Sequence, residues 1–432
     1  MLDIKFLRQN PNLVRENIKK KFQDEKLPLV DLVISLDADY RTKLQELENN
    51  RASMNATAKE IGGYINRGET EKADSAKIRV SELKKSIPKM EEEVRSLELN
   101  IRDIMLKIPQ IIADDVPLGK DDSENVELER FGDFTKNTVS EIPYHVEVME
   151  SFNGLNIDSA RKTSGSGFYY LKGDVARVHS AILSYARDFM IERGFEYYVP
   201  PIMIRGNVVS GVMSFSEMEN MMYKIEGEDL YLIGTSEHSM IGMFTDEIIS
   251  EENLPLSLTS YSPCFRKEVG AHGIEERGIY RIHQFEKQEM VVICKPEDSP
   301  EWFGKLWKTA VDFFLSLDIP VRALECCSGD LADLKVKSVD IEAWSPRLSQ
   351  FFEVGSCSNL GDAQARRLGI RVRVPGSKSD KYFAHTLNNT VVAPPRALIY
   401  FFENNLNPDG SVKIPEPLRI YMGGKAQIFP KK

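Results

Sequence analysis

The stretch CFRKEVGAHGIEERGIYRIHQFEKQE, from Cys264 to Glu289, concentrates arginine, glutamate and phenylalanine around a glycine-containing loop. Because side chains alternate along a strand, a strand over Ile279–Glu289 directs every second side chain to one face. That face carries Arg281, His283, Phe285, Lys287 and Glu289. Arg266 and Glu268 share a face of the preceding strand for the same reason. Such groups can bind a flat polyanion such as an adenine nucleotide. The spacing alone equally fits a surface hairpin with cross-strand ion pairs.

The chain around this stretch predicts an α+β fold. Within residues 166–432, short apolar runs such as MVVIC (290–294) are separated by turns, and one long amphipathic helix is predicted over Val175–Arg193. This arrangement favours an antiparallel sheet flanked by helices over a doubly wound parallel sheet. Neither GxGxxG nor GxxxxGK(S/T) occurs in the sequence, which argues against a Rossmann or P-loop nucleotide site.

The N-terminal part of the chain predicts an antiparallel α-helical coiled-coil hairpin. Apolar residues recur at steps of three and four over 33–61 and again over 76–108. Gly62–Gly68, between the two repeats, has turn chemistry. We expect Pro88 to kink the second helix and Arg51 to fall on the first apolar seam. The pattern by itself favours a structural or dimerising device over a binding arm.

Length and composition predict the domain organisation. The 432 residues suffice for two or three domains, and we expect a helical arm at 1–110, a linker with small strands at 111–165 and the main domain at 166–432. The sequence contains no run of about 18 apolar residues, so no membrane span is expected. The start MLDIKFLRQN does not resemble a signal peptide. The five cysteines have no metal-site spacing, and reduced thiols indicate a cytoplasmic protein.

Charge is unevenly distributed along the chain. The formal net charge is −10, which argues against a protein coated with nucleic acid. Residues 1–110 carry 21 Lys and Arg against 19 Asp and Glu, whereas the remainder carries 35 against 47. A neutral-to-basic arm on an acidic body permits local contact with RNA. Solvated helix faces explain the same numbers.

Six motifs occur in a fixed order: GFEYYVPPIMI, LIGTSEH, the stretch quoted above, CCSGDLADLKVKSVDIEAW, FFEVGSCSNLGDAQARR and HTLNNTVVAPPRALIYFFEN. In this order the chain closely resembles the seryl-tRNA synthetase family, of the class II fold, over nearly its whole length. The resemblance implies a class II catalytic domain that uses ATP, L-serine and Mg²⁺, and an N-terminal arm that binds tRNA(Ser). It also implies a homodimer with Gly194–Pro201 at the interface, and leaves open whether tRNA(Sec) is charged as well.

The resemblance further implies roles for individual residues. Arg266 and Arg396 match the catalytic arginines, which contact the α- and γ-phosphate. The residues that match ATP-binding positions are Arg266, Lys267, Glu268, Arg281, Ile282, Phe285, Glu353, Val354, Gly355, Ser356 and Arg396. Those that match serine-binding positions are Thr235, Ser236, Glu237, Arg266, Glu289, Asn388 and Thr390. Glu353 and Ser356 match the pair that holds Mg²⁺ through ATP.

The reaction that the resemblance implies suits these side chains. A carboxylate attacks the α-phosphorus of ATP and pyrophosphate leaves, so both reacting groups are anionic and catalysis consists mainly of positioning and charge neutralisation. Selection of serine requires partners for its hydroxyl, because an analogue without the hydroxyl then leaves buried polar groups unpaired. Thr235, Glu237 and Thr390 have suitable side chains for this task.

A few positions depart from the family pattern. Gly355 replaces a serine of the ATP-binding segment, and Val269 replaces an alanine after the motif 2 glutamate. Ser236-Glu237-His238 replaces the commoner Ala-Glu-Val. Every charged residue that the chemistry needs is nevertheless present.

Other chemically suggestive residues have plainer interpretations. Four histidines near the motifs lack ligand spacing and are expected to be structural. They are His238, His272, His283 and His385. Lys335 and Lys337 are expected to be solvated along a polar strand.

Two further functions compete with the tRNA synthetase hypothesis. An activating enzyme could hand its amino acid to a carrier protein, but the long arm argues against such a relative. A non-enzymatic relative could bind RNA through the arm, but it would be expected to lose Arg266, Glu289 or Arg396, and all three are present. Serine transfer to tRNA excludes the first alternative, and adenylate formation excludes the second.

Overall fold

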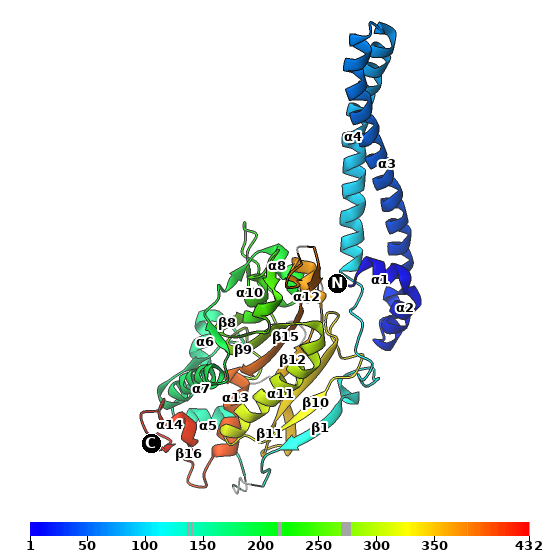
Figure 1. Cartoon of the computed structure of the whole chain (residues 1–432). Coiled ribbons are helices and arrows are strands. Elements are labelled where there is room, and N and C mark those ends of the chain that lie inside the picture. The colour runs from blue at the N-terminus through cyan, green and yellow to red at the C-terminus, as the bar shows by residue number, and fades with distance from the viewer. Residues whose placement is uncertain are drawn as a thin grey trace. The chain divides into compact units, whose positions relative to one another are not determined.

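The computed structural model describes residues 1–135, 139, 141–214, 218, 220–268, 278–377 and 379–431 (Figure 1). Two compact units can be distinguished. The helical unit comprises Leu2–Lys19 and Gln23–Pro109, and the sheet unit comprises Gln110–Lys432 with Met1 and Lys20–Phe22. Val269 and His272 lie outside the described residues.

The helical unit is a long hairpin, as predicted. Its helices are α1 (Ile4–Gln9), α2 (Pro11–Lys20), α3 (Leu27–Asn66) and α4 (Thr70–Met105). The helices α3 and α4 pack along one apolar seam (Figure 1). The seam contains Tyr40, Leu44, Leu47, Met54, Leu83, Ile87, Met90 and Val94. These residues recur at steps of three and four, which confirms the coiled-coil pattern.

Two details of this hairpin, the length of its turn and the position of Arg51, differ from the prediction. Helix α3 continues through Gly62 and Gly63 to Asn66, so the turn is shorter than the glycines suggested. Pro88 lies inside α4, which continues to Met105, and the apolar seam packs on both sides of it; the kink expected at this proline stays a prediction. Arg51 is exposed and pairs with Glu91 at 2.6 Å, so its charge stays in solvent.

The sheet unit is built on an eight-stranded sheet of described strands. Their order is β1 (Val126–Phe131), β10 (Val321–Glu325), β11 (Lys337–Ser345), β12 (Gln350–Asn359), β15 (His385–Val392), β9 (Gln284–Cys294), β8 (Leu256–Phe265) and β4 (Glu196–Tyr198). Neighbouring strands are antiparallel except for the pair β4–β8, which is parallel. The predicted antiparallel sheet is therefore a mixed sheet with a parallel edge.

The segment predicted as a linker contributes to this sheet. Strand β1 pairs with β10 and forms the sheet edge, and Phe131 at its end contacts Trp307 with ring centroids 6.3 Å apart. Small elements follow β1 before the long central helix: α5 (His145–Ser151), β2 (Leu155–Asn156), α6 (Ile157–Ser164) and β3 (Tyr170–Leu171). Residues 111–165 thus belong to the sheet unit.

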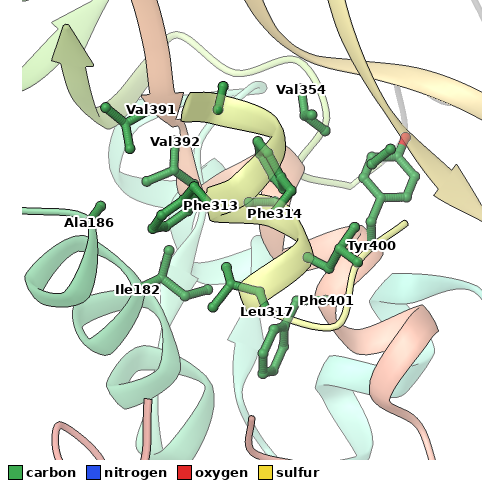
Figure 2. Close-up of a cluster of buried hydrophobic side chains, with 14 of the residues drawn as sticks. Ile182, Ala186, Phe313, Phe314, Leu317, Val354, Val391, Val392, Tyr400 and Phe401 are labelled. Atoms are coloured by element: carbon green, nitrogen blue, oxygen red, sulfur yellow. The ribbon is translucent and has the colours of Figure 1, made fainter. Parts of the chain in front are cut away.

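One sheet face carries the main apolar core. The helices that pack there are α7 (Gly173–Glu192), α11 (Ser299–Ser316) and α13 (Pro394–Asn405). Figure 2 shows side chains of all three helices near Val354 of β12 and near Val391 and Val392 at the end of β15. Those labelled are Ile182, Ala186, Phe313, Phe314, Leu317, Val354, Val391, Val392, Tyr400 and Phe401. Each large side chain of this kind stabilises the fold by about 1.5–3 kcal/mol when fully buried.

Smaller elements complete the sheet unit. The remaining helices are α8 (Gly206–Val212), α10 (Ser236–Gly242), α12 (Ala363–Leu368) and α14 (Glu416–Arg419). The remaining strands are β5 (Met203–Ile204), β6 (Tyr231–Leu232), β7 (Ile248–Ser250), β13 (Arg371–Arg373), β14 (Lys381–Phe383), β16 (Val412–Lys413) and β17 (Gln427–Ile428). Within the described ranges, no helix combines the length and the hydropathy required to cross a bilayer.

Candidate active site

Strand β9 changes character along one of its faces, and this change creates a pocket. Towards its end, Val291 and Ile293 are buried in an apolar cluster with α10 and α12. Two, four and six residues before Val291, the same face carries Glu289, Lys287 and Phe285, which line a cavity of about 600 Å³. The cavity has the size of a typical small-molecule site. Helices α10 and α12 cover the apolar half of this face, whereas the polar half faces the cavity.

The hairpin that precedes β9 differs from the predicted one. Strand β8 ends at Phe265 and β9 begins at Gln284, so Arg281 and His283 lie before the strand. Arg281 still lines the pocket, and its Nη1 lies 3.4 Å from the Glu268 carboxylate. His283 is not among the lining residues. Its Nδ1 lies 3.1 Å from the Tyr223 hydroxyl, as befits the structural role expected of it.

Arg266 is positioned by contacts on two sides. Its Nε donates to the carbonyl oxygen of Gly234 at 3.1 Å, and its guanidinium lies 5.3 Å from the centroid of the Phe285 ring. The backbone N–H of Arg266 donates to the carbonyl oxygen of His283 at 2.9 Å, which fixes the start of the loop. The guanidinium is thus oriented in the pocket beside an aromatic ring.

One end of the pocket contains buried acidic and hydroxyl groups. Glu289 is 1% exposed, accepts a hydrogen bond from the Thr235 hydroxyl at 3.3 Å and forms an ion pair with Lys287. Thr390 stands directly opposite Glu289 in the β15–β9 ladder. Glu237 accepts a hydrogen bond from Gln364 at 2.7 Å. This cluster can bind a small molecule that has both a positively charged group and a hydroxyl group.

Burial changes the acidity of this cluster. Burial, and after it the charge of Glu289, raises the pKa of Glu237 to about 7. Burial also lowers the pKa of His238 to about 3, with the Lys287 charge acting in the same direction. The histidine is therefore neutral at physiological pH, and Glu237 can gain or lose a proton there.

The other end of the pocket carries an ion pair and hydroxyl groups. Arg396 Nη1 lies 2.8 Å from the Glu353 carboxylate, and its guanidinium lies 4.5 Å from the Tyr280 ring centroid. Burial disfavours the charged form of Glu353, but the charge and hydrogen bond of Arg396 outweigh it and lower the pKa of Glu353. Burial and the Glu353 charge raise the pKa of Asp340, on the neighbouring strand, to about 6.

A bulge in β12 brings Glu353 and Ser356 to the same side. Residues three apart on a regular strand face opposite sides. Here Glu353 pairs with Glu342 and Gly355 with Ile341, so Val354 is an extra residue on β12. Val354 packs in the apolar core, while Glu353 and Ser356 both line the pocket. An ideal Cβ on Gly355 would lie 3.3 Å from Thr390 Cβ, so glycine leaves room for Thr390.

Most of the predicted site residues converge on this pocket. Those that line it are Thr235, Glu237, Arg266, Glu268, Arg281, Ile282, Phe285, Glu289, Glu353, Val354, Gly355, Ser356, Asn388, Thr390 and Arg396. Lys267 and Ser236 are not among the lining residues. Ser236 is fully buried and accepts a hydrogen bond from the Ser260 hydroxyl at 2.8 Å, because it begins α10 with its side chain towards β8.

The sequence interpretation missed several lining residues. Lys287 was placed on the right strand face but given no role, although it pairs with Glu289. Asp340 and Lys335 also line the pocket, and the expectation that Lys335 is simply solvated is wrong. The parity of the Phe-x-Lys-x-Glu motif could have identified Lys287. Lys335 lies in a connection between strands, where no periodicity indicates its direction.

Two family models match the chain. The seryl-tRNA synthetase N-terminal domain matches residues 1–112, and the class II core domain of tRNA synthetases (G, H, P, S and T) matches residues 221–405. A serine–tRNA ligase of Pyrococcus horikoshii is 40% identical over 449 residues, covering 100% of this chain and 98% of the relative.

Solved structures agree with these matches along the whole chain. The crystal structure of seryl-tRNA synthetase from Pyrococcus horikoshii complexed with ATP has a TM-score of 0.92 and 38% identity, with both chains covered completely. The cytoplasmic serine–tRNA ligase of Naegleria fowleri, in complex with AMP, has a TM-score of 0.85 and 32% identity, covering 100% of this chain and 99% of that one. Both units of the chain therefore have counterparts in one architecture.

Proposed function

The chain belongs to the seryl-tRNA synthetase family and is a class II serine–tRNA ligase that uses ATP. We propose that its pocket activates serine by binding ATP beside the arginines and serine beside the buried carboxylates. Phe285 and Arg266 bracket the adenine and α-phosphate of ATP, and Arg396 holds the γ-phosphate. Support comes from their convergence on one cavity and from the fixed orientation of Arg266. Catalysis here requires positioned positive charge, because nucleophile and electrophile are both anionic.

The acidic end of the pocket binds L-serine in this proposal. Glu289 and Glu237 attract the ammonium group, and Thr235, Thr390 and Asn388 surround the hydroxyl. Three of these side chains are already close together, since the Thr235 hydroxyl lies 3.3 Å from Glu289 and Thr390 is opposite Glu289 in the ladder. A cluster of buried hydrogen-bonding groups penalises alanine, which would leave them unpaired.

The donor set between Arg396 and Asp340 suits Mg²⁺. Glu353 supplies a carboxylate and Ser356 a hydroxyl on the same side of β12, and hard oxygen donors of this kind hold Mg²⁺ together with substrate phosphates. The ion would supply further neutralisation of the phosphate charge. Glu353 can bind a cation because Arg396 lowers the pKa of its carboxyl group and so keeps it ionised.

The helical unit serves as the tRNA-binding arm in this proposal, and two chains act as a homodimer. The arm presents exposed basic side chains along its two helices, including Lys59, Lys84 and Arg95. The sheet unit exposes apolar side chains within and beside the predicted interface motif: Val199, which is 71% exposed, lies within it, and Ile191 and Met203 flank it. Exposed apolar residues of this kind mark surfaces that bury against a partner.

A cytoplasmic location is consistent with the cysteines. All five are free and buried, and disulfides are rare where thiols are kept reduced. Fractionation of cells followed by detection of the protein would test this location directly.

The experiment that tests the proposed function is ATP–pyrophosphate exchange with each amino acid in turn, in the absence of tRNA. Exchange stimulated by serine, together with its loss in Glu289→Gln, would support the proposed division of the pocket. Serine-dependent exchange that survives both Glu289→Gln and Thr235→Val would contradict the assignment of the acidic end. Sedimentation of the wild type and of Val199→Asp tests the homodimer.

A further inference from the structure

A lysine that the proposed reaction does not use lies at the Mg²⁺ end of the pocket. Lys335 is half-buried in the connection between β10 and β11 and lines the cavity. Its Nζ donates to the Ser356 hydroxyl at 3.3 Å and to the Ser338 hydroxyl at 3.1 Å. These two hydroxyl oxygens lie 3.3 Å apart. The ammonium is therefore directly beside one of the two proposed Mg²⁺ ligands.

The backbone fixes the position of this lysine. The Lys335 N–H donates to the carbonyl oxygen of Ala332 at 3.1 Å, and the Val336 N–H donates to that of Asn359 at 2.8 Å, which ties the connection to the end of β12. Leu334, the preceding residue, is buried against Leu360. A lysine anchored on both sides loses less freedom on binding a ligand than one on a mobile surface.

The wall around Lys335 is acidic. Its charge acts on Asp340 and on Glu353, both of which line the cavity. Asp330 and Cys326 complete this wall, and their potential ligand atoms and those of Asp340 lie within 4.8 Å of one another. An acidic wall repels the polyphosphate of ATP, so binding there requires positive charge on the protein side. Lys335 places an ammonium in this position.

We propose that Lys335 binds the β- and γ-phosphates of ATP, and the pyrophosphate that leaves, as a cationic contact in addition to the two arginines. The flexible four-carbon stem lets the ammonium move from the two serine hydroxyls to phosphate oxygens in the same pocket. The inference rests on the proposed function in one respect, namely that Arg396 and Glu353 mark the phosphate end. It assigns Lys335 to substrate binding, whereas the neighbouring Lys337 remains a structural residue.

Binding of ATP and of AMP to four purified proteins tests this proposal: the wild type, Lys335→Met, Lys335→Arg and Lys337→Met. AMP lacks the β- and γ-phosphates, so a lysine that contacts them discriminates between the two nucleotides. We expect Lys335→Met to weaken ATP binding by about tenfold or more, as loss of a hydrogen bond to a charged group predicts, and to leave AMP binding within about twofold. Lys335→Arg should restore most of the loss.

Lys337→Met is the matched control. Lys337 lies two residues further along the chain, pairs with Asp115 at 2.6 Å and Glu325 at 2.9 Å, and is not among the lining residues. The Lys337→Met protein should bind ATP and AMP as tightly as the wild type does. Equal weakening of ATP and AMP in Lys335→Met, or no weakening, would overturn the proposal, and a lowered melting temperature with equal weakening would identify Lys335 as merely structural.

The same proteins separate this inference from the proposed function. If the wild type shows no serine-dependent pyrophosphate exchange, the proposed function fails. If exchange occurs but the KM for ATP is the same in Lys335→Met and the wild type, only the role of Lys335 fails. A rise in the KM for ATP with an unchanged KM for serine supports both.

Discussion

The helical unit and the sheet unit are stabilised in different ways. The described part of the hairpin buries one narrow seam, and its charged side chains pair in solvent, as Arg51 does with Glu91. Such exposed pairs contribute only about 0–1 kcal/mol each. The sheet unit instead buries large aromatic side chains, such as Phe313 and Phe401, on one face of an eight-stranded sheet (Figure 2).

This difference parallels the proposed division of the reaction between the two units. All residues that line the pocket come from the sheet unit. In the proposed function, serine is activated on the densely packed sheet unit, whereas the hairpin offers length and exposed charge. A change in either unit should affect its own step first.

The largest expected effect comes from the pocket. Arg266→Ala should reduce serine-dependent pyrophosphate exchange by about 10²–10³-fold, because it removes a positioned charge that stabilises the transition state. Arg130→Ala is the control, since Arg130 lies on the edge strand β1, paired with Glu127 at 2.7 Å. Exchange kinetics of both variants measure the effect, and similar losses would show that the pocket assignment is wrong.

Shortening the arm should affect only the second step. Removal of residues 51–87, with a short glycine turn joining the helices, preserves the lower part of the seam around Leu44 and Val94. Exchange should stay within about twofold, while the kcat/KM for serine transfer to tRNA falls by about a hundredfold or more through lost phosphate contacts. Equal loss of both steps would contradict the separation of the two units.

The pH dependence of serine binding should follow Glu237. Its pKa is raised to about 7, and the ionised form attracts the ammonium group of serine. The KM for serine should therefore fall by about tenfold between pH 6 and pH 8, and Glu237→Gln should bind serine weakly at every pH. Pyrophosphate exchange assays across this pH range measure the KM for serine of the wild type and of Glu237→Gln.

The same raised pKa has a consequence for stability. Protonated Glu237 contributes stability that is fully present below its unfolded pKa of 4.5 and is lost as the pH rises through about 7. Glu237→Gln should flatten this part of the stability curve. Chemical denaturation of the wild type and of Glu237→Gln between pH 4.5 and pH 7.5 measures this effect. If the free energy of unfolding has the same pH dependence in both proteins, the raised pKa is not that of Glu237.

The two smallest effects come from glycines, one in each unit. Gly355→Ala places a Cβ about 3.3 Å from that of Thr390 and should raise the KM for serine a few-fold. Gly62→Ala meets open space in the interior of α3 and should stabilise the hairpin by about 0.5–1 kcal/mol. Steady-state kinetics and thermal unfolding, respectively, measure the two outcomes. A stabilised arm with altered exchange would show that the units are coupled.

The sequence predicted elements that depend on local periodicity. The two apolar repeats identify α3 and α4, and the alternation in Phe-x-Lys-x-Glu places Phe285, Lys287 and Glu289 on one face. It did not predict that β8 ends at Phe265, nor that residues 126–131 join the main sheet, because both depend on pairing with distant strands.

Ordered motifs and periodic apolar positions are local features of the chain, and they suffice to identify the family, the two kinds of architecture and most of the charged pocket residues. Tertiary structure alone decided which side chains face the pocket. The bulge at Val354 brings Glu353 and Ser356 together, the start of α10 turns Ser236 towards β8, and the connection before β11 brings Lys335 beside Ser356. Each of these depends on hydrogen bonds between separate segments of the chain, which the periodicity within one segment does not contain.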